Sequence, residues 1–104
     1  MKMGFGVDYV IGSLGRNNIA SKIANGHAFR KHSHEFGINS KGAFASMIQD
    51  IMKNPTETKI GSGGQRLYWS DKYGAFLSVN PNDKKGDFGT VFKPTDGKKY
   101  YDRQ

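Results

Sequence analysis

The sequence predicts an α+β fold, with two N-terminal helices packed on one face of a twisted, four- to five-stranded antiparallel sheet. Three observations support this fold class. Apolar residues recur at helical spacing through the first half of the chain. After Pro55, apolar and polar residues alternate, which is typical of strands. The links between the candidate strands are short and rich in turn-forming residues, which favours antiparallel neighbours.

The chain has 104 residues, a length that suits a single domain. We expect residues 1–15 to be an extended lead-in or linker end, and residues 16–104 to be the folded domain. The beginning of the sequence looks like the cut end of a larger polypeptide. The chain contains no cysteine, so it has neither a disulfide framework nor a thiolate metal site.

The first helix is predicted to begin with Asn17 or Asn18 as its N-cap and to run to about His34. Gly26 interrupts it at modest cost, and Gly37 is its natural end. Its apolar stripe is formed by Ile19, Ala20, Ile23, Ala24, His27 and Ala28.

The second helix is predicted to begin at Ser40, which can act as an N-cap, and to end at Asn54-Pro55. Its apolar residues follow a regular helical spacing, which assigns them to the core: Phe44, Met47, Ile48, Ile51 and Met52.

The second half of the chain is predicted to form strands at Thr56–Ile60, Gln65–Ser70, Ala75–Asn80, Asp87–Lys93 and, more weakly, Lys98–Tyr101. If the purely aliphatic sets face the helices, the open face of the sheet carries a cation, hydroxyls and aromatic rings: Arg66, Tyr68, Phe76, Ser78, Thr90 and Phe92. Such a set resembles a platform for single-stranded RNA. The alternative is that the aromatic residues are core and the two faces are exchanged.

The most distinctive segment is 27–38, HAFRKHSHEFGI, which holds all three histidines of the chain. Histidine changes its charge near neutral pH, so it can carry the proton that general acid–base catalysis moves. Neighbouring cations attract a phosphate. We expect His32 to lie at the margin of the buried face, near the C-terminal end of the first helix. His32, His34 and Glu35 could form part of a metal site. However, His32 and His34 are two residues apart and would point to different sides of a helix, so no metal site or other cofactor is predicted unless the helix ends by residue 32.

The net charge of +7 and the pI near 9.7 imply an acidic partner, and nucleic acid is the first choice. A charge that serves only solubility is the simpler alternative. No apolar run approaches the roughly 18 residues that a membrane span needs.

Three stretches resemble a known family. Lys31-His32, followed by Phe36-Gly37-Ile38 and an amphipathic helix, resembles the nuclease domain of colicin D. The strand 89–94, GTVFKP, is similar to that family's final active-site strand, where a serine or threonine precedes an aromatic residue by two positions. The strand 65–68, QRLY, is similar to the wider group of barnase-like and RelE-like toxin ribonucleases. The resemblance covers about residues 25–95.

This resemblance implies a barnase/RelE-like fold and a metal-independent endoribonuclease that cuts tRNA in the anticodon loop, leaving a 2′,3′-cyclic phosphate and a 5′-hydroxyl. The family's catalytic histidine and lysine map onto His32 and Lys31, and its hydroxyl and aromatic residues map onto Thr90 and Phe92. The chain departs from the family at Phe29, where a further lysine can occur, and at Phe92, which replaces a tryptophan.

Because the lysine at position 29 is missing, Arg30, Lys31 or Arg66 is expected to bind the phosphate. The complete expectation is a catalytic set of His32, Lys31, Arg66 and Thr90, and a substrate-binding set of Arg30, Tyr68, Phe92 and Lys93. It requires His32, Arg66 and Thr90 to lie close enough to touch one scissile linkage.

The resemblance also implies that residues 16–104 are the toxin tip of a contact-dependent growth inhibition effector. Such a tip is delivered from the cell surface, acts in the cytoplasm of a target cell and is blocked by an acidic cognate immunity protein. The isolated domain is expected to be a monomer that does not engage a membrane.

Two other functions fit the same residues. A non-catalytic basic module would bind RNA tightly and in a salt-sensitive way, and would leave it intact. A metal-dependent DNase toxin would use His32 and His34 with a divalent ion.

Overall fold

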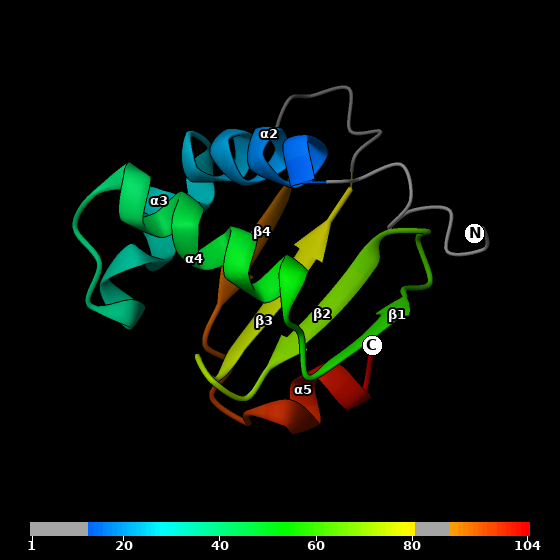
Figure 1. Ribbon diagram of the computed structural model, residues 1–104. Coiled ribbons are helices and arrows are strands. Elements are labelled where there is room, and N and C mark those ends of the chain that lie inside the picture. The colour runs from blue at the N-terminus through cyan, green and yellow to red at the C-terminus, as the bar shows by residue number, and fades with distance from the viewer. Residues whose placement is uncertain (1–12, 81–87) are drawn as a thin grey trace.

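The computed structural model describes residues 13–80 and 88–104, and within these ranges the chain forms an α+β fold with a four-stranded antiparallel sheet. The predicted fold class is therefore confirmed at this level. Helices precede the sheet in the chain and lie across it, and a short helix closes the described C-terminal part (Figure 1).

The first predicted helix is divided into three pieces: α2 (Ser13–Ala24), α3 (His27–His32) and the 3₁₀ helix η1 (Ser33–Phe36). Helix α2 begins at Ser13, so the expected N-caps at positions 17 and 18 lie inside it. Residues 13–15 of the expected lead-in belong to this helix, and residues 1–12 lie outside the described residues. The prediction of one continuous helix is wrong.

The break between α2 and α3 lies at Gly26, whose backbone is extended, with φ −94° and ψ −159°. Its N–H donates to the carbonyl of Ile23 at 3.0 Å, which ends the α-helical hydrogen bonding of α2. The break lets α3 change direction and lie against strand β4. Gly37 ends η1 in the left-handed conformation, with φ +66°, so the predicted end of this region is confirmed.

Helix α4 (Lys41–Lys53) has the predicted cap and the predicted buried side. The hydroxyl of Ser40 accepts a hydrogen bond from the N–H of Ala43 at 3.1 Å. The helix ends before Asn54, whose N–H donates to the carbonyl of Asp50 at 2.8 Å. The five residues assigned to the core are all buried: Phe44, Met47, Ile48, Ile51 and Met52.

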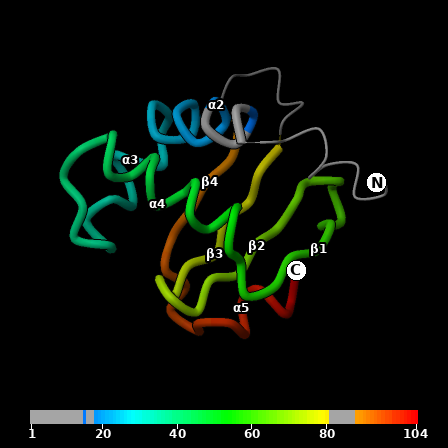
Figure 2. The backbone as a smooth tube through the Cα atoms, in the orientation of Figure 1, coloured from blue at the N-terminus to red at the C-terminus, as the bar shows by residue number. Residues whose placement is uncertain are grey.

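The sheet is a meander of β1 (Glu57–Ile60), β2 (Arg66–Ser70), β3 (Ala75–Val79) and β4 (Gly89–Phe92), and each strand pairs antiparallel with the next. Figure 2 follows this back-and-forth path. Four predicted strands are therefore confirmed, with ends that differ by a residue or two. The predicted turn at 81–86 falls within residues 81–87, which lie outside the described residues.

The predicted weak strand Lys98–Tyr101 is instead a short helix, α5 (Lys98–Asp102). Gly97 precedes it with φ +62°, and the N–H of Tyr100 donates to the Gly97 carbonyl at 3.1 Å. The chain therefore turns back under the sheet instead of pairing with β4. The prediction of a fifth strand here is wrong.

The sheet separates two apolar layers. Helices α2 and α4 cover one face and share its larger core with Tyr68, Leu77 and Val91. On the opposite face α5 covers a smaller cluster, made of Leu67, Trp69, Phe76 and Tyr101, with Phe92 and Tyr100 at its margin. Each face of the sheet therefore carries an apolar cluster: one is covered by α2 and α4, and the other by α5.

Candidate active site at the edge of strand β4

The His32 side chain lies where the sequence predicts it, at the C-terminal end of α3 and only partly exposed. It is the last residue of the helix, and 25% of its side chain is accessible to solvent. Its ring packs against Phe92 on the neighbouring strand, with 5.5 Å between centroids. The imidazole therefore sits at the β4 edge of the sheet, beside Phe92, which was expected to bind substrate.

Glu35 connects this histidine to the sheet. Its Oε2 atom lies 2.6 Å from Nδ1 of His32, and its Oε1 atom accepts a hydrogen bond from the N–H of Lys93 at 2.9 Å. The turn from α3 into η1 places residues 32 and 35 on the same side of the chain. One carboxylate thus fixes the imidazole and joins the end of β4 to the helical segment.

The charge state of Glu35 follows from these contacts. Burial raises its pKa, while the hydrogen bonds from His32 and from the Lys93 amide lower it, and the net result is a pKa below the usual value. The carboxylate is therefore ionised at neutral pH. An ionised acceptor at Nδ1 places a proton on that nitrogen, so in the neutral ring Nε2 keeps its lone pair. Nε2 is then the nitrogen that can take a proton from a substrate.

Phe92 is the aromatic residue that packs directly against the imidazole of His32. Its ring packs on His32 from one direction and on Tyr100 from another, with a centroid separation of 5.2 Å for the second pair. Phe76 lies behind it at 5.6 Å. The Phe92 ring is therefore enclosed by aromatic neighbours, and its packing holds α3, β4 and α5 together.

Thr90 lies on the same face of β4 as Phe92, because side chains two residues apart in a strand point the same way. The two Cα positions are about 6.6 Å apart along the strand. Thr90 pairs with Ser78 across the sheet, and both side chains are half-buried. The side chains of Thr90 and Ser78 thus lie next to Phe92, on the sheet face that carries α5 and not on the face that carries α2 and α4.

Gly89, the residue before Thr90, is required by the close approach of β4 to β3. A Cβ at this position would lie 2.0 Å from the Ser78 carbonyl oxygen, and the φ angle is +156°. Only glycine avoids this collision. The glycine in the 89–94 stretch that carries the family resemblance therefore has a structural reason of its own.

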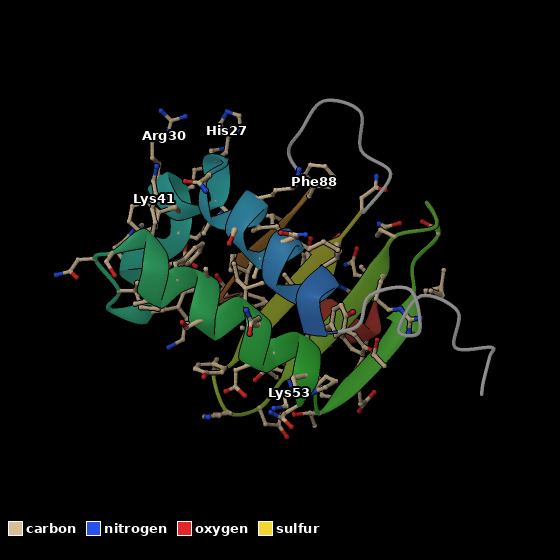
Figure 3. The ribbon with its side chains drawn as sticks, turned by 45° about the horizontal axis from the view of Figure 1, so that its top comes forward. His27, Arg30, Lys41, Lys53 and Phe88 are labelled. Atoms are coloured by element: carbon tan, nitrogen blue, oxygen red, sulfur yellow. The ribbon has the colours of Figure 1, made fainter. Side chains whose placement is uncertain are left out.

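The three basic residues expected near His32, which are Lys31, Arg30 and Lys93, lie in different directions from its ring. Lys31 is exposed and directly precedes the histidine. Arg30 lies on the opposite side of α3 from His32, because residues two apart in a helix are separated by about 200°. Figure 3 shows the side chains of Arg30 and His27 projecting in the same direction from α3, away from the sheet. Lys93 is exposed, with its ammonium 5.9 Å from the centroid of Phe36 in η1.

The expected position of Arg66 is wrong. In the register of the sheet Arg66 lies opposite Val79, on the face that carries α2 and α4, while Thr90 lies on the other face. Its guanidinium reaches toward β1, where Nη1 lies 3.5 Å from Oγ1 of Thr58. His32 lies beyond the other edge of the sheet, next to β4. His32, Arg66 and Thr90 therefore do not meet at one linkage, and we assign Arg66 no role in this site.

Tyr68 is also placed differently from the expectation. It pairs with Leu77 and is 2% exposed within the larger core, so it cannot stack on a base. The faces of β2 are exchanged relative to the prediction: Leu67 and Trp69 share a face with Phe76. The helix-side face of β3 is as predicted, with Ala75, Leu77 and Val79 buried against the helices.

Two residues of the site were not assigned to it from the sequence. Glu35 was seen only as a possible metal ligand, although its spacing of three from His32 is a signal for a side-chain pair within a helical turn. Tyr100 was placed in a weak strand. Gly97 followed by Lys98-Lys99-Tyr100-Tyr101 gives little local evidence for a helix, so Tyr100 had no sequence signal that linked it to Phe92.

Within residues 13–80 and 88–104, no three His, Cys, Asp or Glu side chains are grouped so that they could hold a metal ion. The helices in the same part of the chain include none with both the length and the apolar character needed to cross a bilayer. No family model matches the sequence, and no curated protein is significantly similar to it.

Proposed function

We propose that this protein is a metal-independent endoribonuclease toxin that acts on tRNA. The observation that carries the proposal is the pairing of His32 with an ionised Glu35 at a partly exposed edge of the sheet. A histidine held in this way presents Nε2 as the atom that can take a proton from a substrate. The net charge of +7 supports a polyanionic substrate.

The proposed reaction is an attack of the ribose 2′-oxygen on the neighbouring phosphorus. Nε2 of His32 takes the 2′-hydroxyl proton, and Glu35 stabilises the resulting imidazolium. The bond from phosphorus to the 5′-oxygen breaks, and this oxygen takes a proton from solvent or from a donor outside the His32–Glu35 pair. Lys31 and the hydroxyl of Thr90 stabilise the negative charge that develops on the phosphoryl oxygens. The products are a 2′,3′-cyclic phosphate and a 5′-hydroxyl.

The proposal includes a relationship to colicin D-like nucleases and a barnase/RelE-like fold. Its support is the sequence resemblance at Lys31-His32 and in the 89–94 strand, together with an arrangement in which the main helices lie on one sheet face. His32 and Phe92 are in contact, and Thr90 shares a sheet face with Phe92. Arg66 and Tyr68 are left out of this version of the site, and Arg30 and Lys93 are kept only as peripheral phosphate contacts.

By the same resemblance, we propose that the domain is the tip of a larger contact-dependent growth inhibition effector. It would cut the anticodon loop of tRNA in the target-cell cytoplasm. An acidic immunity protein would neutralise it, which is consistent with its own positive charge.

The deciding experiment incubates the purified protein with total tRNA in the presence of EDTA. We expect discrete fragments whose new 5′ ends are phosphorylated by a polynucleotide kinase without prior phosphatase treatment. The His32→Ala variant serves as the inactive control. RNA that is bound tightly but stays intact would identify a non-catalytic binding module, and plasmid nicking that appears only with a divalent ion would identify a metal-dependent DNase. Either result would end the proposal.

A further inference from the structure

We propose that Tyr100, with Arg103, forms a binding subsite for the nucleobase next to the scissile phosphate. This inference rests on the proposed ribonuclease function, because it assigns a place to a second part of the same substrate. It concerns α5, the helix that the sequence did not predict, and it replaces the base-stacking role expected for the buried Tyr68.

A continuous row of rings joins this subsite to the His32–Glu35 pair. The imidazole of His32 lies 5.5 Å from the Phe92 ring, and the Phe92 ring lies 5.2 Å from the Tyr100 ring. The guanidinium carbon of Arg103 lies 5.9 Å from the Tyr100 centroid. Phe92 is thus the spacer between the proton-transfer group and the tyrosine, and a nucleotide bound at His32 can extend toward α5.

One face of the Tyr100 ring lies under the guanidinium of Arg103. The contacts of Tyr100 with Phe76 and Phe92 are perpendicular, with interplanar angles of 80° and 75°. Its side chain is half-buried, whereas that of the adjacent Tyr101 is 2% exposed and belongs to the core. Tyr100 is therefore held by perpendicular ring contacts, and the face toward the exposed Arg103 is the one that a planar ligand can reach. Stacking on such a face is how proteins commonly bind unpaired bases.

Arg103 supplies the second side of the subsite. A base stacked between two planar groups needs about 7 Å between them, twice the usual carbon contact of about 3.5 Å. The separation of 5.9 Å is close to that value, so a small outward movement of Arg103 admits a base. The arginine side chain is 56% exposed, and its ion pair with Asp96 lies at the surface, where such a pair holds it weakly. A guanidinium stacks on bases as well as on aromatic rings.

The test compares Tyr100→Leu, Tyr100→Phe and Arg103→Ala with the unmodified protein on short RNA substrates that differ in the base on each side of the cleaved linkage. Tyr73→Leu is the matched control, because Tyr73 is another half-buried tyrosine but lies at the turn between β2 and β3, bonded to Asp50 of α4. Steady-state kinetics give KM and kcat separately, and fluorescence anisotropy gives the Kd for a non-cleavable RNA with a 2′-deoxy group at the cut site.

We expect Tyr100→Leu to raise KM and Kd by about 5- to 100-fold, the usual effect of removing one stacking ring, with little change in kcat. The preference for one flanking base should weaken in the same variant. Tyr100→Phe should behave like the unmodified protein, since stacking needs the ring and not the hydroxyl. Arg103→Ala should raise KM severalfold, and Tyr73→Leu should change stability but not base preference.

The inference is overturned if Tyr100→Leu binds and cleaves like the unmodified protein, or if Tyr100→Phe is as defective as Tyr100→Leu. If Tyr100→Leu does not fold, Arg103→Ala decides alone, because its side chain is at the surface: an unchanged KM and unchanged base preference then refute the subsite. A failure of the proposed function looks different, because the unmodified protein would then leave every RNA uncut.

Discussion

Nδ1 of His32 and Oε2 of Glu35 are 2.6 Å apart, and this contact joins the last residue of α3 to a carboxylate that also binds the backbone of Lys93. The same carboxylate therefore orients the imidazole and holds η1 against the end of β4. We expect its effect on activity to come through the histidine, which makes Glu35 a positioning residue.

Replacement of His32 by Ala should reduce tRNA cleavage by about 10²- to 10⁴-fold, the contribution typical of a general acid–base group. Glu35→Gln should reduce kcat by about 10- to 100-fold, because Gln keeps an oxygen for the Lys93 amide but loses the charge that orients the ring. His27→Ala is the matched control, since His27 is exposed at the other end of α3 and points away from the sheet (Figure 3). Initial rates with tRNA measure all three, and equal activity of His32→Ala and His27→Ala would contradict the assignment.

Lys31→Gln should lower catalytic activity, whereas Arg66→Gln should affect only the stability of the fold. Lys31 adjoins His32, so the loss of its charge should lower kcat/KM by at least about tenfold, although less than the roughly 10²- to 10³-fold typical of a well-aligned buried donor. Arg66 lies on the opposite sheet face from Thr90 and reaches toward Thr58. Its replacement should therefore leave kcat/KM unchanged and act only on stability. Thermal unfolding of both variants separates the two effects. A large loss of activity in Arg66→Gln would restore the arrangement expected from the sequence.

The carboxylate of Asp50 should stabilise the fold at neutral pH and lose this effect in acid. It accepts hydrogen bonds from Lys72 at 2.9 Å and from the hydroxyl of Tyr73 at 2.6 Å, and together with Asn54 they hold its pKa well below the ordinary value of 3.8. A lowered pKa in the folded state means that the stabilisation is complete above about pH 4 and fades as the pH falls below that value.

We therefore expect Asp50→Asn to reduce the free energy of unfolding by about 1–2 kcal/mol at pH 7 and by less at pH 3. Tyr73→Phe should account for much of this loss, because Lys72 is highly exposed and its ion pair adds little. Urea denaturation at the two pH values gives the comparison. A loss that is the same at both would show that the charge of Asp50 is not the stabilising feature.

Gly89→Ala should destabilise the protein by about 1–3 kcal/mol, the range expected for forcing atoms into a packed site. The added Cβ would collide with the Ser78 carbonyl at 2.0 Å and push β4 from β3. Gly42→Ala is the matched control: it lies in α4, nothing is within 4 Å of the added Cβ, and alanine favours the helix by up to about 1 kcal/mol. Chemical denaturation should therefore give changes of opposite sign, and a neutral Gly89→Ala would contradict the packing.

Local signals predicted much of the fold. Ser40 and the apolar spacing after it specified α4, and alternation with short turns specified the four-stranded meander. These features depend on neighbours within a few residues, where capping and periodicity act directly. The position of His32 at the margin of the core followed from the same helical spacing, and the left-handed Gly37 ended the segment as expected.

The candidate site was only partly predictable for the same reason. Thr90 and Phe92 share a face because alternation along one strand requires it. The contact of His32 with Phe92 was not predicted, because the two residues are far apart in the chain. The residues of β2 that lie on the same sheet face as Thr90 and Phe92 were not predictable. Strand β2 is apolar on both sides, since α4 covers one side and α5 the other. Alternation alone therefore cannot say which side of β2 meets which helix. This ambiguity led to the wrong placement of Arg66.

Local patterns in the chain were enough to predict most helices and strands and to place His32 at the margin of the core. Which aromatic residues pack around its imidazole depends on the tertiary fold. Phe92 meets the imidazole because the chain breaks at Gly26 and turns α3 toward β4, and Tyr100 packs against Phe92 because Gly97 turns the chain into α5 under the sheet. Both outcomes depend on burying apolar surface between segments far apart in the chain, and such packing leaves no local pattern to read.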